Sequence, residues 1–166
     1  MSHFVFSADG HVLEPEGLFT EGLPASLREH GIHSRVEGNY IFTYAGETLL
    51  HRLPRNPRPV PGTEAFGRPH QKGARDIAAR LEDMALEGID AEIVFPNAAM
   101  MSSLIHHPEA ELGTTVLYND WIDGFLGAHL DRFVRCGVLP VRDFVNTVTE
   151  MERIARLGFT AAMIPT

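Results

Sequence analysis

An aspartate and a histidine, two positions apart, stand where the first apolar run of the chain ends. The run begins at Phe4 and ends at Asp9, and Gly10 and His11 follow directly. In a strand, residues two apart point to the same face, so both side chains would project together from its carboxyl end. A carboxylate oxygen and an imidazole nitrogen at this spacing can share one divalent cation, and zinc or manganese suits such a pair. An Asp-Gly pair at a strand end is also a common turn, which is the alternative role for these residues.

Four short apolar runs, each ending at a polar residue or a proline, are predicted strands. They cover residues 4–9, 91–96, 135–140 and 161–165. Their near-continuous hydrophobicity is typical of strands buried on both faces, as in a parallel sheet. Proline has no N–H to donate to a neighbouring strand, so the proline at the end of three of these runs marks where the strand stops.

Helical patterns lie between the apolar runs, over residues 74–87, 109–131 and 143–157. On the first of these helices, Arg80 and Asp83 are three residues apart, and we expect them to pair on the surface. The alternation of strands with helices predicts an α/β fold with a parallel sheet.

One long segment, residues 13–73, interrupts this alternation. It is rich in glycine and proline and has no strong helix signal. Within it, residues 34–50 alternate in polarity around two predicted turns, which indicates one or two small hairpins. Loops of this length are usually functional or disordered. The aromatic residues Tyr40, Phe42 and Tyr44 favour an ordered flap over a site.

The composition is that of an ordinary globular protein of one domain, with 166 residues, 44% of them hydrophobic and 22% charged. A net charge of −8 opposes binding to nucleic acid, which needs a basic face. No apolar run approaches the roughly 20 residues that cross a bilayer. The single cysteine, Cys136, lies in an apolar run and is expected to be a buried, inert thiol. Without a signal peptide, we expect a cytoplasmic protein without membrane or nucleic-acid partners.

The chain resembles the amidohydrolase-related family, in the branch that includes metal-dependent decarboxylases of aromatic acids. The resemblance rests on blocks that occur in the family's order and span nearly the whole chain. They are SADGHVLEP at 7–15, RLEDM at 80–84, EGID at 87–90, VFP at 94–96, YNDW at 118–121, LP at 139–140 and LGF at 157–159.

This resemblance implies a (β/α)₈ barrel whose first strand provides two ligands of a single divalent ion, here Asp9 and His11. Many members have two histidines at these positions, and the aspartate matches the branch with an acidic residue in the first place. The other ligands, a histidine and an aspartate, and the catalytic acid or base belong to the second half of the barrel. A complete barrel needs about 250 residues. We therefore expect residues 1–166 to be one partial domain, the first half of a TIM-type barrel with a hairpin-containing insertion at 13–73.

Four further residues are candidates for contacts with substrate or for support of the metal ligands. Glu14 lies in the same block as Asp9 and His11, and its alternative role is a loop cap. Arg52 could clamp a carboxylate in a bidentate fork, or it could face solvent. Asn97 and His106 follow the second strand, where barrel loops meet substrate, and a turn and a surface position are their alternative roles.

The expected function is therefore that of a metal enzyme that hydrolyses or decarboxylates a small carboxylated substrate. The sequence is expected to be either a piece of a longer protein or a half-barrel that associates with a second copy. The competing hypothesis is a non-catalytic half-barrel that acts as an oligomerising structural or binding module. In either case we expect a homo-oligomer.

Overall fold

A four-stranded parallel sheet forms the centre of the computed structural model, which describes residues 3–55 and 72–164. The strand order is β1-β5-β6-β7, so each strand lies beside the next one of this sheet along the chain. The strands are β1 (Phe6–His11), β5 (Ala91–Phe95), β6 (Phe133–Val138) and β7 (Ala161–Met163). The parallel sheet predicted from the apolar runs is confirmed, with strand ends displaced by up to two residues.

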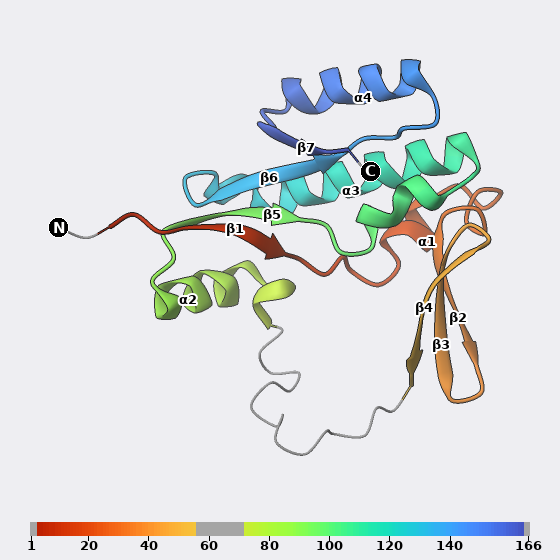
Figure 1. Cartoon of the computed structure of the whole chain (residues 1–166), viewed down its shortest axis with the longest axis horizontal. Coiled ribbons are helices and arrows are strands. Elements are labelled where there is room, and N and C mark those ends of the chain that lie inside the picture. Colours follow the sequence, from red (N-terminus) through yellow and green to blue (C-terminus); the bar gives the residue numbers. More distant parts are fainter. Residues whose placement is uncertain (1–2, 56–71, 165–166) are drawn as a thin grey trace.

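Three helices follow the strands in alternation and flank the sheet (Figure 1). They are α2 (Ile77–Glu87), α3 (Pro108–Leu126) and α4 (Phe144–Arg156), with short 3₁₀ turns at η3 (Ala99–Leu104) and η4 (Gly127–His129). Side chains cap two of these helices, because Asp76 and Asp143 each accept a hydrogen bond from a backbone N–H of the first turn. Helix α2 ends at Gly88, whose φ of 70° places it in the left-handed region that glycine favours.

A second, antiparallel sheet occupies much of the long segment after β1. A short helix, α1 (Leu18–Gly22), comes first, followed by β2 (Ile32–Glu37), β3 (Tyr40–Ala45) and β4 (Thr48–Pro54). The two turns of this meander use Gly38 and Gly46, both with φ of 57°. Figure 1 shows that the meander projects beyond the end of the parallel sheet at which β1 terminates. We call this three-stranded unit, residues 32–54, the flap.

The hydrophobic core lies between the parallel sheet and its helices. Side chains that are fully buried there include Val94, Tyr118, Ile122, Leu126 and Val138. Each contributes roughly 1.5–3 kcal/mol by its removal from water. Cys136 is buried in the same layer, as the sequence predicts, and burial raises the pKa of its thiol to about 11. No helix within residues 3–55 and 72–164 is long and apolar enough to cross a membrane.

Candidate functional site

An irregularity in β1 shapes the strand end that carries the predicted metal ligands. Ser7 pairs with Glu92 and Gly10 pairs with Val94, so three steps along β1 match only two along β5. This extra residue is a β-bulge, which bends a strand and re-aims its side chains. The bulge directly precedes His11, at the carboxyl edge of the sheet, where the active sites of parallel α/β folds are built.

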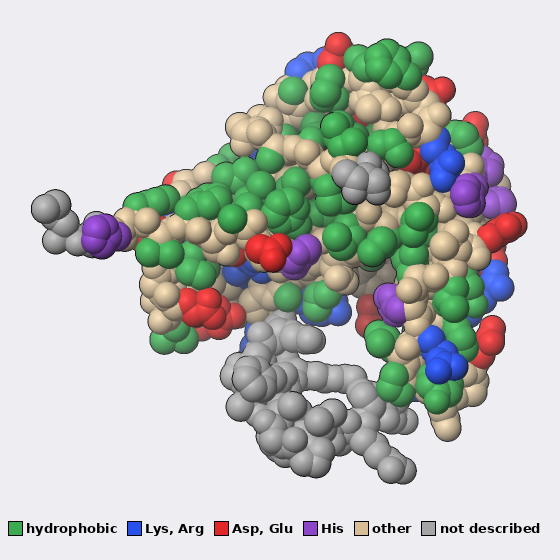
Figure 2. Space-filling model, in the orientation of Figure 1, with side chains coloured by type: hydrophobic (Ala, Val, Ile, Leu, Met, Phe, Trp, Pro, Cys, Tyr) green, Lys and Arg blue, Asp and Glu red, His purple; other side chains and the backbone are tan. Residues whose placement is uncertain are grey.

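The structure brings Asp9 and His11 together. Asp9 Oδ1 lies 3.4 Å from His11 Nε2, and the side chains are 91% and 44% exposed. The other ring nitrogen, Nδ1, lies 2.9 Å from the carbonyl oxygen of Pro96. In Figure 2, acidic and histidine side chains lie together on this face, at the place where Figure 1 shows the end of β1.

These distances decide which nitrogen of His11 carries the proton in the neutral ring. A carbonyl oxygen only accepts hydrogen bonds, so Nδ1 must donate to Pro96 and Nε2 keeps its lone pair. Nε2 lies 3.4 Å from Asp9 Oδ1, and two facing acceptors need a cation between them: either a proton on Nε2, which makes an ion pair with Asp9, or a metal ion. A cation stabilises such an arrangement, and the donor set of one carboxylate and one imidazole fits zinc or manganese.

The pair alone does not make a metal site. No group of three or more histidine, cysteine, aspartate or glutamate side chains is arranged to hold a metal within the described part of the chain. Catalytic zinc sites usually have three protein ligands and one open position. The high exposure of Asp9 leaves room around the pair for further ligands.

Glu14 is fully engaged with the loop that follows β5. Its Oε1 accepts hydrogen bonds from the backbone N–H groups of Asn97 (3.1 Å) and Ala99 (2.9 Å), and its Oε2 accepts one from Ala98 (3.0 Å). The carboxylate therefore acts as the cap of this loop and of the η3 turn. Since His11 donates to Pro96 in the same loop, Glu14 and His11 together tie the ends of β1 and β5. Asn97 is exposed beside them.

Arg52 and His106 lie on other elements. The guanidinium of Arg52, on β4, stacks over the Tyr40 ring at 4.6 Å from its centroid. His106 is exposed just before α3 and lines a shallow hollow of about 310 Å³ together with His30, Glu47 and other residues. Within residues 3–55 and 72–164, no hydrogen bond or ion pair joins Arg52 or His106 to Asp9 or His11.

The prediction that Arg80 and Asp83 pair on the surface is wrong. Arg80 is 8% exposed and forms a buried ion pair with Glu92 of β5. Its Nη1 also donates to the carbonyl oxygens of His11 (2.8 Å) and Gly73 (3.2 Å). Arg80 lies four residues before the buried Met84, on the face of α2 that packs against the sheet. The strand residue that pairs with Arg80 could not be identified from the helix alone.

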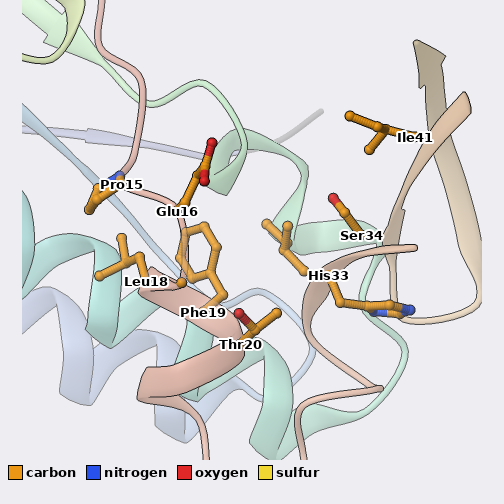
Figure 3. A pocket seen from close by; sticks show the side chains of 10 residues that line it. Pro15, Glu16, Leu18, Phe19, Thr20, His33, Ser34 and Ile41 are labelled. Atoms are coloured by element: carbon orange, nitrogen blue, oxygen red, sulfur yellow. The ribbon is translucent and has the colours of Figure 1, made fainter. Parts of the chain in front are cut away.

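A larger hollow of about 400 Å³ lies between α1 and the flap and was not anticipated from the sequence (Figure 3). Figure 3 shows Glu16 and Phe19 on the α1 side and Ser34 and Ile41 on the flap side. Asp9 and His11 do not line it. Its residues have ordinary types and no distinctive spacing, so no sequence signal marks it.

Two kinds of solved enzyme structure share this fold. An amidohydrolase from Mycobacterium avium subsp. paratuberculosis superimposes with a TM-score of 0.76 at 20% identity, over 98% of this chain and 49% of that one. A 2,6-dihydroxybenzoate decarboxylase from Rhizobium gives a TM-score of 0.55 at 18% identity, over 98% of this chain and 38% of that one.

A dihydroxybenzoic acid decarboxylase from Polaromonas, solved with bound manganese and the inhibitor 2-nitroresorcinol, gives a TM-score of 0.55 at 19% identity, with coverage of 98% and 38%. The chain matches no protein-family model, and no curated protein is significantly similar to it in sequence. The chain therefore has the fold of these amidohydrolase and decarboxylase enzymes over less than half of their length, which confirms, for the fold, the resemblance read from the sequence.

Proposed function

We propose that this chain is the metal-binding front half of a cytoplasmic amidohydrolase-related enzyme that hydrolyses or decarboxylates a small carboxylated substrate. Residues 1–166 would form the first half of a (β/α)₈ barrel, with 13–73 inserted after the first strand. The observation that carries the proposal is the pair at the end of β1, where His11 Nε2 faces Asp9 Oδ1 at 3.4 Å.

The hydrogen bond from His11 to Pro96 supports a metal-binding role. Histidines that bind metals almost always donate their second ring N–H to a carboxylate, a backbone carbonyl or water, which fixes the tautomer and the ring orientation. Nδ1 of His11 has this partner at 2.9 Å.

A bound divalent ion would supply Lewis acidity toward a water molecule or a substrate oxygen. Asp9 and His11 would hold the ion, and the loop fixed by Glu14 would keep them in place. We propose that the remaining ligands and the general acid or base come from outside residues 1–166, since the chain covers 49% of the amidohydrolase it matches. Both reactions remain within the proposal, because the residues described serve either.

Substrate contacts are proposed for Arg52, Asn97 and His106. Arg52 would bind a substrate carboxylate after leaving the face of the Tyr40 ring, since guanidinium and carboxylate form a bidentate pair. Asn97 lies close to the pair in space, because it directly follows Pro96, whose carbonyl oxygen is 2.9 Å from His11 Nδ1. His106 lies in the loop before α3, and this loop would have to move toward the pair for His106 to contact the substrate.

A titration of the chain with Mn²⁺ tests the metal site. The EPR signal of the ion that stays free in solution gives the amount bound. The variant Asp9→Ala/His11→Ala is expected to lose the bound Mn²⁺, because both proposed ligands are gone. A matched variant, Asp131→Ala/His51→Ala, removes an exposed aspartate and an exposed histidine elsewhere and should bind like the wild type. Equal Mn²⁺ binding by the first variant and the wild type would falsify the site assignment.

A second function, that of an oligomerising half-barrel, is favoured by the edges of the parallel sheet. Within the described residues, β1 and β7 each pair with one neighbour only. Phe4 is 74% exposed beside β1, and Ile164 is 68% exposed after β7. Unpaired, apolar strand edges template the addition of another chain. Light scattering coupled to size-exclusion chromatography tests this function: a defined oligomer without metal supports it, and a monomer excludes it.

A further inference from the structure

We propose that Arg80 is a positioning residue for the metal-binding pair, which it holds through the main chain of His11. This inference rests on the metal site proposed above and assigns a role to a residue outside it. Arg80 belongs to helix α2, is 8% exposed and donates to the carbonyl oxygen of His11. As a cation it is not a ligand for a metal ion.

One guanidinium group ties three segments of the chain together. Its Nε pairs with the Glu92 carboxylate on β5, and its Nη1 donates to the His11 carbonyl oxygen at 2.8 Å and the Gly73 carbonyl oxygen at 3.2 Å. The planar guanidinium presents five donors in a rigid fork, so it can serve all three acceptors at once. The ammonium of lysine lacks this geometry.

Gly10, the residue between the two metal ligands, lies directly on this ion pair. A Cβ atom at Gly10 would stand 2.5 Å from Glu92 Oε2 and 2.9 Å from Arg80 Nη2. Only glycine therefore lets the bulged strand end rest on the Arg80–Glu92 pair. Gly10, which separates Asp9 from His11, therefore packs directly against the buried Arg80–Glu92 ion pair.

His11 is consequently fixed at two points. Its ring donates to the Pro96 carbonyl at 2.9 Å, and its own carbonyl accepts from Arg80 at 2.8 Å. Ligands of a functional site must be held within about 0.5 Å of the required geometry, which needs such support from the surrounding shell. A buried ion pair is weak evidence for stability, because apolar replacements are often equally stable. We therefore assign the Arg80–Glu92 pair a role in fixing the position of His11 rather than in stabilising the fold.

A second buried arginine, on a strand of the parallel sheet, provides a matched control. Arg135 of β6 is 4% exposed, pairs with Asp123 of α3 and donates to the Leu157 carbonyl oxygen at 3.1 Å. It makes the same kinds of contact as Arg80, on a strand that does not border β1. Loss of this pair should disturb folding in a similar way without affecting His11.

The test compares Arg80→Met/Glu92→Leu with Arg135→Met/Asp123→Leu, each of which removes both charges so that none is left buried alone. Circular dichroism and the thermal midpoint establish that both fold. The dissociation constant for Mn²⁺ is expected to rise roughly 10- to 100-fold in the Arg80 variant, the usual effect of losing support around a metal ligand. In the Arg135 variant it should stay within about 2-fold of the wild type.

Arg80→Lys provides a second variant if the double substitution does not fold. It keeps a positive charge beside Glu92 but cannot also hold both carbonyl groups, so Mn²⁺ binding should again weaken several-fold. The imidazole ¹⁵N shifts of His11 in the metal-free protein add a readout that folding alone does not move. The wild type should show Nδ1 protonated, and the Arg80 variants should show a mixture of tautomers.

Unchanged Mn²⁺ affinity together with an unchanged His11 tautomer in a folded Arg80 variant would overturn the proposal. An equal loss of affinity in the Arg135 variant would also overturn it, since the effect would then be general. If the metal site itself is wrong, the Asp9→Ala/His11→Ala variant binds Mn²⁺ like the wild type. In that case the tautomer of His11 still decides whether Arg80 positions it.

Discussion

At the scale of residues, the chemistry of the site depends on contacts between positions that are far apart in the chain. The Asp9 and His11 pair could be predicted, because residues two apart in a strand share a face. The partner that orients His11 could not be predicted, because the Pro96 carbonyl lies 85 positions away. The prediction of a surface pair for Arg80 is wrong for the same reason, since Arg80 pairs with Glu92 on strand β5.

Cys136 provides a prediction about pH at this scale. Burial raises the pKa of its thiol from 9.0 to about 11, so the folded state holds the proton over a range in which the unfolded state has released it. The protonated thiol therefore contributes to the free energy of unfolding. This contribution is fully present below pH 9 and is lost as the pH rises through about 11. Two pKa units correspond to about 3 kcal/mol. Urea unfolding of the wild type and Cys136→Ala should show a stability difference that declines between these pH values.

A pH-independent difference between the two proteins across that range would mean that the thiol is not held in its protonated form by the fold. Thiol modification checks the same point by another route. Cys136 should react slowly with an aromatic disulfide reagent at pH 8 in the native protein and rapidly after unfolding.

At the scale of elements, buried polar side chains connect the helices to the sheet. Asn119 of α3 pairs with Val138 as a neighbouring strand would: its Oδ1 accepts from the Val138 N–H (2.8 Å) and its Nδ2 donates to the Val138 carbonyl (2.9 Å). Glu111 holds the next loop, accepting from the N–H groups of Val141 (3.0 Å) and Arg142 (3.1 Å). Glu14 does the same after β5. Two carboxylates thus fix the loops at the carboxyl edge of the sheet.

Replacement of Asn119 by alanine should lower the free energy of unfolding by about 3 kcal/mol, because it leaves the Val138 N–H and carbonyl buried without partners. Glu150, which also accepts from Asn119 Nδ2 at 2.6 Å, would lose a partner as well. Thr149→Ala on the exposed face of α4 is the control and should change the free energy by less than about 0.5 kcal/mol. A loss as small as the control's in a urea titration would show that Val138 finds other partners.

The existence and order of these elements could be read from the sequence, and their ends less well. The helix predicted over 109–131 stops at Leu126 and continues as a 3₁₀ turn, in a stretch diluted by glycines. The apolar runs located all four parallel strands. Burial on both faces explains the continuous hydrophobicity of β5 and β6, whereas the edge strand β1 is mostly exposed and β7 is only partly buried, so the expected burial is wrong for these two. The hollow between α1 and the flap had no such signal, because it results from packing between segments rather than from any local pattern.

At the scale of the whole molecule, the chain has a parallel α/β fold that corresponds to about half of the amidohydrolase it matches, and we propose that it carries part of a metal site. The match to the amidohydrolase covers 98% of this chain and 49% of that one, so the similarity is not confined to one part of the sequence given. The proposed ligands Asp9 and His11 lie at the carboxyl edge of the sheet, and the segments around them are held by Glu14 and by the Arg80–Glu92 pair. These supporting contacts are present within the described residues, whereas no group of three potential metal ligands is.

We propose that His11 binds a divalent ion through Nε2 with Asp9 beside it, and pulsed EPR of bound Mn²⁺ can detect such a nitrogen ligand. The wild-type protein should show the modulation of a single directly bound imidazole nitrogen, and His11→Gln should abolish it while circular dichroism stays unchanged. If the wild-type spectrum shows no nitrogen modulation, or if the modulation persists in His11→Gln, His11 is not a ligand of the ion.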